Sequence, residues 1–137
     1  MTAKEYLSQA HRIDKRINSK LEQVKSLRSL AEKATSTLSN TPASSTRNVS
    51  RMEDVIVKMV DLEAEINADI DALVDLKREI ITIIKSLDNA EYQTLLELRY
   101  LCFMRWETIA VELSYSSQHM FRLHDAALKE IDSQIGE

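Results

Sequence analysis

Apolar residues recur at alternating steps of three and four in two long stretches, and this spacing most constrains the fold. From residue 3 to residue 38, ten of the eleven positions on this stripe are apolar, and Lys20 is the exception. From residue 52 to residue 87, ten of eleven are again apolar, and Asp69 is the exception. A 3.5-residue repeat sustained over such a length is typical of a helix that packs along another helix. The sequence therefore predicts two long helices, the first opened by Thr2 with Glu5 as a capping box.

The two stripes can be laid antiparallel about the segment 39–51, where Pro42 stands among Ser, Thr and Asn residues. Proline and such clusters interrupt helices, so this segment is the predicted linker and Pro42 its bend. If the two layers nearest the linker are set at the same height, the polar positions Lys20 and Asp69 fall in one layer. A single polar layer with opposite charges can set the register of a helical hairpin. The predicted layers are Leu38 with Met52, Ala34 with Val55, Ala31 with Met59, Leu27 with Leu62, Val24 with Ile66, Lys20 with Asp69, Ile17 with Leu73, Ile13 with Leu76, Ala10 with Ile80, Tyr6 with Ile83 and Ala3 with Leu87.

The scarcity of glycine excludes several classes of protein. The chain has one glycine, Gly136, and one proline. Glycine-rich phosphate loops need at least two glycines, so P-loop NTPases and Rossmann enzymes are excluded. Tight β-hairpins need residues that tolerate positive φ, chiefly Gly, Asn or Asp, so we do not expect a β-meander, sandwich or barrel. The single cysteine, Cys102, excludes an internal disulfide and a multi-cysteine zinc site, and we expect it to be a small buried hydrophobe. The prediction is an all-α protein without cofactor: a long antiparallel coiled-coil hairpin over 1–88, then a second domain over 89–137.

Charge and a second apolar edge predict self-association. Residues 1–51 carry a net charge of +6 and residues 52–88 a net charge of −6, so the two long helices complement each other. The second helix has a further apolar edge that a two-helix hairpin leaves wet, which requires either a second chain or the C-terminal domain as a neighbour. We expect a homo-oligomer, with a dimer favoured, through residues 1–88. The edge consists of Ile56, Val60, Ile70, Val74, Ile81 and Ile84.

The last fifty residues predict three short helices. Asp88 to Glu91 form a helix start with an acid or amide cap, and the helix runs to Leu101. After a break at 102–105, a second helix covers 106–113, with Trp106 packed against Leu98 and Leu101. A turn at 114–116, in which Ser114 takes the left-handed place usual for glycine, leads to a last helix from Gln118 towards Ile135, capped by Ser117.

The packing demands of a helix-turn-helix are met by position in these last two helices. A small residue, Ala110, stands where the two helices touch, and Ile109 and Leu113 flank it. The buried face of the last helix is spaced by threes and fours: Met120, Leu123, Ala127 and Ile131.

These residues carry a resemblance to a known family. Leu95 to Tyr100, Trp106 to Ala110, Ser116 with Met120, and Ala127 with Leu128 resemble the DNA-reading fourth region of bacterial sigma-70-type sigma factors. The stretch from Tyr115 to Leu128 resembles small phage and prophage regulators of Gram-positive bacteria. The resemblance covers about residues 88–133.

The resemblance implies binding to double-stranded DNA, with the helix at about 117–133 in the major groove. Its first residues, Ser117, Gln118, His119 and Arg122, would face base edges, where Gln can pair with adenine and Arg with guanine. Arg105 would contact phosphate. RNA polymerase is a further implied partner.

The charge of this segment opposes that interpretation and keeps an alternative open. Residues 89–137 carry a net charge of −4, whereas affinity for DNA comes mainly from Lys and Arg at phosphates. The alternative is a helical assembly or adaptor protein, including a DNA-packaging subunit, whose coiled coil contacts other proteins. We expect no enzymatic activity, because no nucleophile–base pair or metal constellation is apparent. His119 and His124, five apart, are interpreted as surface or groove-facing residues.

The sequence contains neither a membrane span nor a signal peptide, so the expected location of the protein is the cytoplasm.

Overall fold

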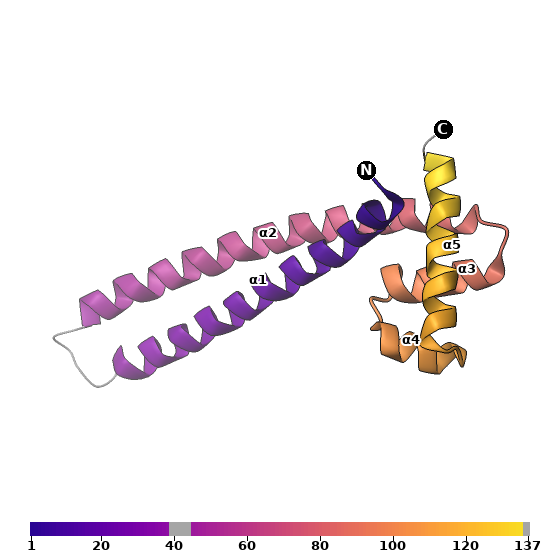
Figure 1. Ribbon diagram of the computed structural model, residues 1–137. Coiled ribbons are helices and arrows are strands. Elements are labelled where there is room, and N and C mark those ends of the chain that lie inside the picture. Colours follow the sequence, from indigo (N-terminus) through magenta and orange to yellow (C-terminus); the bar gives the residue numbers. More distant parts are fainter. Residues whose placement is uncertain (39–44, 136–137) are drawn as a thin grey trace. The chain divides into compact units, whose positions relative to one another are not determined.

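The structure is a computed structural model that describes residues 1–38 and 45–135, without the side chains of 35–38 and 45–48. Over these residues the chain is helical with short connections and has no β-strand, which confirms the all-α prediction. The elements are α1 (Ala3–Leu38), α2 (Ser45–Lys85), α3 (Ala90–Leu96), a π-helical turn η2 (Glu97–Leu101), α4 (Trp106–Leu113) and α5 (Ser117–Ile135). Figure 1 shows the two long helices, α1 and α2, lying side by side.

Helix α2 begins earlier than the apolar stripe predicts. Residues 45–51, assigned to the linker, are already helical. Ser, Thr and Asn cost a helix less than about 1 kcal/mol each, and they are favoured near its start, so they do not delay α2. Pro42 lies outside the described residues, and the predicted layer of Leu38 with Met52 involves a Leu38 side chain that is not described.

The chain divides into two compact units, and each contains parts of α1 and α2. Unit 1 comprises Met1–Asp14 and Leu73–Glu137, and unit 2 comprises Lys15–Ala72. The first unit therefore joins the chain's N-terminal residues to the four C-terminal elements, and the expected boundary after residue 88 falls inside it.

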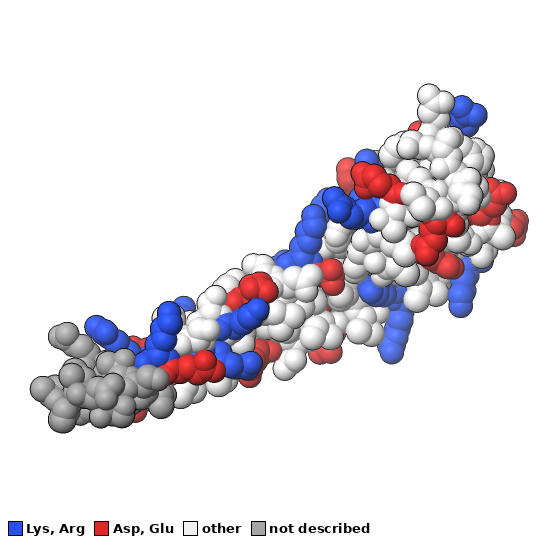
Figure 2. Space-filling view, turned by 90° about the horizontal axis from the view of Figure 1, so that it is seen from below, with Lys and Arg blue, Asp and Glu red and all other residues white. Residues whose placement is uncertain are grey.

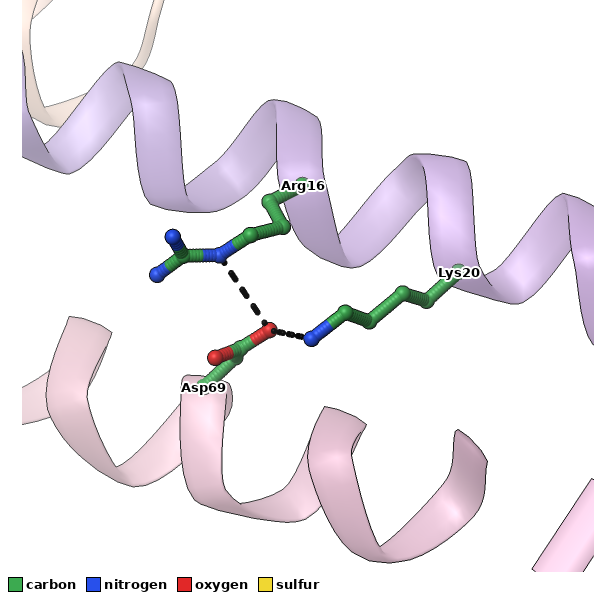
Figure 3. A network of polar contacts seen from close by, with 3 residues as sticks. All are labelled: Arg16, Lys20 and Asp69. Carbon is green, nitrogen blue, oxygen red and sulfur yellow. Dashed lines mark hydrogen bonds and ion pairs between the residues drawn. The ribbon is translucent and has the colours of Figure 1, made fainter. Parts of the chain in front are cut away.

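Unit 2 is a pair of antiparallel helical segments. Among the side chains of this unit that the structure describes, the buried apolar ones are Ile17, Val24 and Ile66, and all three stand on the predicted stripes. Lys20 on α1 and Asp69 on α2, the polar residues of the two stripes, meet through a 2.8 Å hydrogen bond from Nζ to Oδ2. Arg16, one turn before Lys20, also approaches Asp69, with Nε 3.5 Å from Oδ2 (Figure 3).

Unit 1 has a core built on small residues of α1. Ala3, Leu7 and Ala10 are fully buried and pack with the end of α2 and with α5. Alanines let helix backbones approach closely, and each fully buried Leu or Ile contributes roughly 1.5–3 kcal/mol. The other buried members of this cluster are Ile80, Ile84, Leu87, Leu96, Tyr100, Ala127 and Ile131.

Two sets of polar contacts hold the start of α1 in this unit. Glu5 N donates to Thr2 Oγ1 at 3.2 Å and Thr2 N donates to Glu5 Oε2 at 3.4 Å, which is the predicted capping box. Ala3 N, one of the free amides of the first turn, donates to Asp132 Oδ1 of α5 at 2.7 Å. The carboxylate thus satisfies a helix N-terminal amide and ties the start of α1 to α5.

Candidate nucleic-acid interface

The connection between α4 and α5 is a three-residue turn whose first residue is left-handed. Ser114 has φ 59° and ψ 40°, as the sequence predicts for a position where glycine is usual. Tyr115 N donates to Ala110 O at 2.9 Å, which satisfies a carbonyl at the end of α4. The Tyr115 hydroxyl donates to Glu91 Oε2 at 3.0 Å and so fastens the turn to α3.

Helix α5 begins one residue earlier than predicted. Ser117 is its first residue, and the cap is Ser116, whose Oγ accepts from His119 N at 3.1 Å. Two adjacent serines are equally good caps by type, and the length of the turn decides between them. At the start of α3 the cap is the side chain of Asn89: its Oδ1 accepts from Glu91 N at 2.9 Å and from Tyr92 N at 3.2 Å.

A second buried cluster holds α4 and α5 together. Ile109, Ala110 and Met120 are buried there with Leu95 of α3, while Leu113 and Leu123 pack against them partly exposed. The residues that the spacing assigned to the contact between the two helices therefore lie in it. Ala110, at 8% exposure, is the small residue that this contact requires.

The predicted base-facing residues of α5 are all exposed. Ser117, Gln118, His119 and Arg122 lie in solvent on the first two turns, while Met120 between them points into the core. Gln118 and Arg122 are four apart, so they lie on one face of the helix. The His119 ring stands edge-on to Tyr115, with centroids 4.7 Å apart.

Arg105 is exposed at the N-cap of α4 and makes no side-chain capping bond. Within the described residues it forms no hydrogen bond or ion pair with the α5 residues. The structure therefore groups the α5 residues by their helix and leaves Arg105 separate from them.

Trp106 is the centre of an aromatic cluster that the sequence only partly predicts. Its ring centroid lies 5.2 Å from that of Phe121 and 4.6 Å from that of His124, and the Arg99 guanidinium carbon lies 4.4 Å above it. Arg99 Nη1 also donates to Met104 O at 2.8 Å. Leu98 shares the cluster around Trp106 as expected, whereas Leu101 packs in the other cluster.

His124 is buried, and the prediction of a surface or groove-facing histidine is wrong. It is 4% exposed, and its Nε2 lies 2.6 Å from the Tyr100 hydroxyl. Burial lowers the pKa of His124 to about 4, and burial raises the pKa of Tyr100 to about 12. Both groups are therefore neutral, and a single hydrogen bond joins the phenol to the imidazole. Positions 120, 124, 127 and 131 are spaced by four, three and four, and this spacing could have identified His124 as a core residue.

Cys102 is exposed, and the prediction that it is buried is wrong. It precedes Phe103, which has a positive φ of 58°. The Phe103 ring stacks on His11 with centroids 5.0 Å apart, and Lys77 Nζ lies 4.7 Å from its centroid. The larger neighbour takes the apolar contact in this connection, so the thiol faces solvent.

Acidic side chains lie among the basic ones around the C-terminal helices. On the face drawn in Figure 2, red and blue side chains are interspersed over these helices and form no continuous basic surface. Glu107, Val111 and Glu112 are all exposed on α4. Among the described residues, no group of three or more His, Cys, Asp or Glu could hold a metal ion, and no helix is long and apolar enough to cross a membrane.

Comparison with known proteins gives one family. Residues 33–132 match the family described as "Protein of unknown function (DUF1492)", and because the match covers more than half of the chain, the protein belongs to this family. No curated protein and no solved structure matches the chain.

Proposed function

We propose that this protein is a sequence-specific DNA-binding transcriptional regulator of phage or prophage origin, with α5 as its recognition helix. It would act in the cytoplasm on double-stranded DNA, with RNA polymerase as a further partner. The proposal draws on the resemblance of residues 88–133 to the fourth region of sigma-70-type sigma factors.

The observation that carries the proposal is the division of α5 into two faces. Met120, Ala127 and Ile131 anchor one face in the core, and the opposite face begins with exposed hydrogen-bonding residues. An anchored helix with a free N-terminal end is what insertion into the major groove requires. Gln118 could read adenine and Arg122 guanine through two hydrogen bonds each.

Phosphate contacts must come from few residues. Arg105 and the backbone amides of the first turn of α5 are the local candidates. The basic residues of α1 could supply further contacts. Because counterion release scales with these contacts, affinity should fall as salt rises.

The test is selection of bound duplexes from a random library by the full-length protein, followed by affinity measurements on the selected duplex. Arg122→Ala should weaken binding and relax the preference at one base pair, at a cost of about 1–3 kcal/mol. The matched control is Lys129→Ala, an exposed cation seven residues further along the same helix, which should change affinity by less than Arg122→Ala does. Equal effects of both variants would contradict base reading by α5.

A second function, an assembly or adaptor role that includes DNA packaging, is favoured by α4. Glu107, Val111 and Glu112 are exposed there, and two exposed acids would repel phosphates, so this surface suits a protein partner better than DNA. Sedimentation distinguishes the two functions, since a ring of many chains suits packaging and a small oligomer suits a regulator.

A further inference from the structure

The two long helices of unit 2 leave an open groove on one side. The groove has a volume of about 860 Å³, and both helices line it mainly with polar and charged side chains. Leu27 and Leu62, which the register places in one layer, are its apolar floor. The lining residues are Ser19, Glu22, Gln23, Ser26, Leu27, Lys58, Asp61, Leu62 and Glu65.

The opposite side of unit 2 is apolar on α2. Residues nine apart on a helix lie two and a half turns apart and therefore on opposite faces. Asp61 and Glu65 line the groove. Ile56 is nine residues before Glu65 and Ile70 is nine after Asp61, so both isoleucines lie on the face of α2 opposite the groove. Ile56 is 49% exposed, Ile70 is 41% exposed, and Val60, on the same stripe as Ile56, is 58% exposed.

On α1 the corresponding side carries Leu21 and two cations. Leu21 is 49% exposed and lies on the opposite face from Leu30, which follows the groove residue Ser26 by one turn. Lys25 and Arg28 lie four and seven residues after Leu21, so they share its face, and both are exposed. We name the surface of Leu21, Lys25, Arg28, Ile56, Val60, Glu63 and Ile70 the outer face.

The outer face is charged in a self-complementary way. Glu63, seven residues after Ile56, is the exposed acid of the α2 stripe, and Glu53 and Asp71 border that stripe. Within the described part of the chain, Lys25, Arg28 and Glu63 form no ion pair. One half of the face is apolar with acids and the other half is basic, so a single chain carries both halves of a complementary interface.

We propose that the outer face is a homodimer interface, in which α1 of each copy packs on the α2 stripe of the other. This isologous contact buries Ile56, Val60 and Ile70 of both chains and gives a four-helix bundle. The bond between Lys20 and Asp69 makes residue 28 of α1 level with residue 61 of α2 and residue 25 level with residue 64. A two-fold axis along the helices preserves these levels and brings Arg28 and Lys25 to Glu63 of the second copy.

The first test is sedimentation equilibrium of the full-length protein over a range of concentrations. We expect a monomer–dimer equilibrium, and Leu21→Glu should raise its Kd at least about tenfold, because residue 21 is level with residue 68 and the new carboxylate would be buried against the apolar Ile70 of the second copy. Leu30→Glu is the matched control, since Leu30 is 51% exposed on the same helix but on the groove side, and its Kd should equal that of the wild type. Helical circular dichroism checks that both variants fold.

The second test separates this interface from contact with a different basic helix. Arg28→Glu alone should weaken the dimer, and Glu63→Arg alone should weaken it too, because each variant opposes like charges in both contacts of its homodimer. An equimolar mixture of the two variants should recover the dimer. In the mixed dimer one contact keeps the native pair of charges, and the other contact carries the same pair with its signs exchanged. A monomeric wild type, equal effects of the two leucine variants, or no recovery in the mixture would overturn the proposal.

Discussion

The Tyr100 hydroxyl and His124 Nε2 lie 2.6 Å apart in the interior of unit 1, between η2 and α5. The two rings are also stacked, with centroids 5.7 Å apart and an interplanar angle of 22°. Trp106, the first residue of α4, stands edge-on to the same histidine. A buried polar pair with one acceptor and one donor is stable only while both groups remain, and this gives two predictions.

Tyr100→Phe removes the hydroxyl and leaves a ring nitrogen of His124 without its hydrogen-bond partner. An unsatisfied buried polar group costs about 1–3 kcal/mol, so the free energy of unfolding in urea should fall by that amount. Tyr92→Phe is the control, because Tyr92 is partly buried and its hydroxyl makes no hydrogen bond within the described residues. A loss as large in the control would show that the Tyr100 bond contributes nothing of its own.

Acid should destabilise the protein through His124. An unfolded histidine titrates near pH 6.5, whereas the folded pKa is about 4. Between these values the unfolded chain binds a proton that the folded chain does not, so stability falls as the pH is lowered from 6.5 to 4. The total is about 3 kcal/mol, and above pH 6.5 this group has no effect. Urea titrations of the wild type and of His124→Phe measure it: the variant should lose less stability over this window, and parallel curves would refute the assignment.

Substitution of each of two adjacent serines, Ser116 and Ser117, shows which of them caps α5. Ser116→Ala removes the oxygen that accepts from His119 N and should cost about 1 kcal/mol of stability. Ser117→Ala changes an exposed residue inside the first turn and should be within about 0.5 kcal/mol of the wild type. Thermal unfolding of both variants decides the matter, and the reverse order would return the cap to Ser117.

The polar layer of unit 2 should respond to single and double changes differently. Lys20 lowers the pKa of Asp69, chiefly through its hydrogen bond, so the folded unit favours the charged carboxylate. Lys20→Leu leaves that carboxylate with Arg16 alone and should lower the melting temperature. Lys20→Leu with Asp69→Leu should restore or exceed the original value, because an apolar layer avoids the desolvation of two charges. If the single change stabilises as much as the double, the two residues are not energetic partners.

Spacing was enough for the first long helix and for one specific contact, although it placed the start of α2 too late. Periods of three and four predict α1 over its full length, and the meeting of Lys20 with Asp69 follows from the same count once the layers nearest the linker are set level. The breaks on either side predict α4 at both ends. Helical spacing is a local property, so a prediction from it needs no knowledge of tertiary neighbours. The cap of α5 needed more, because Ser116 and Ser117 are alike by type and the turn's geometry chooses between them.

Residue type misled where packing decides burial. Histidine is often a surface residue and cysteine mostly a buried one, yet His124 is buried and Cys102 is exposed. His124 occupies a core position and finds Tyr100 as a partner, whereas Cys102 lies in a connection where Phe103 takes the apolar contact. Likewise, the burial of Leu7 and Ile84 depends on the C-terminal helices packing onto the ends of α1 and α2, which no local pattern specifies.

The affinity of the full-length protein for its selected duplex, relative to a duplex of scrambled sequence, tests the proposed function most directly. Measured by fluorescence anisotropy at several salt concentrations, the selected duplex should bind at least about 10³-fold more tightly at physiological salt. Both affinities should fall as salt rises, because phosphate contacts release counterions. Equal affinity for the two duplexes, or no binding to either at low salt, would contradict the account of α5 as a helix that reads DNA.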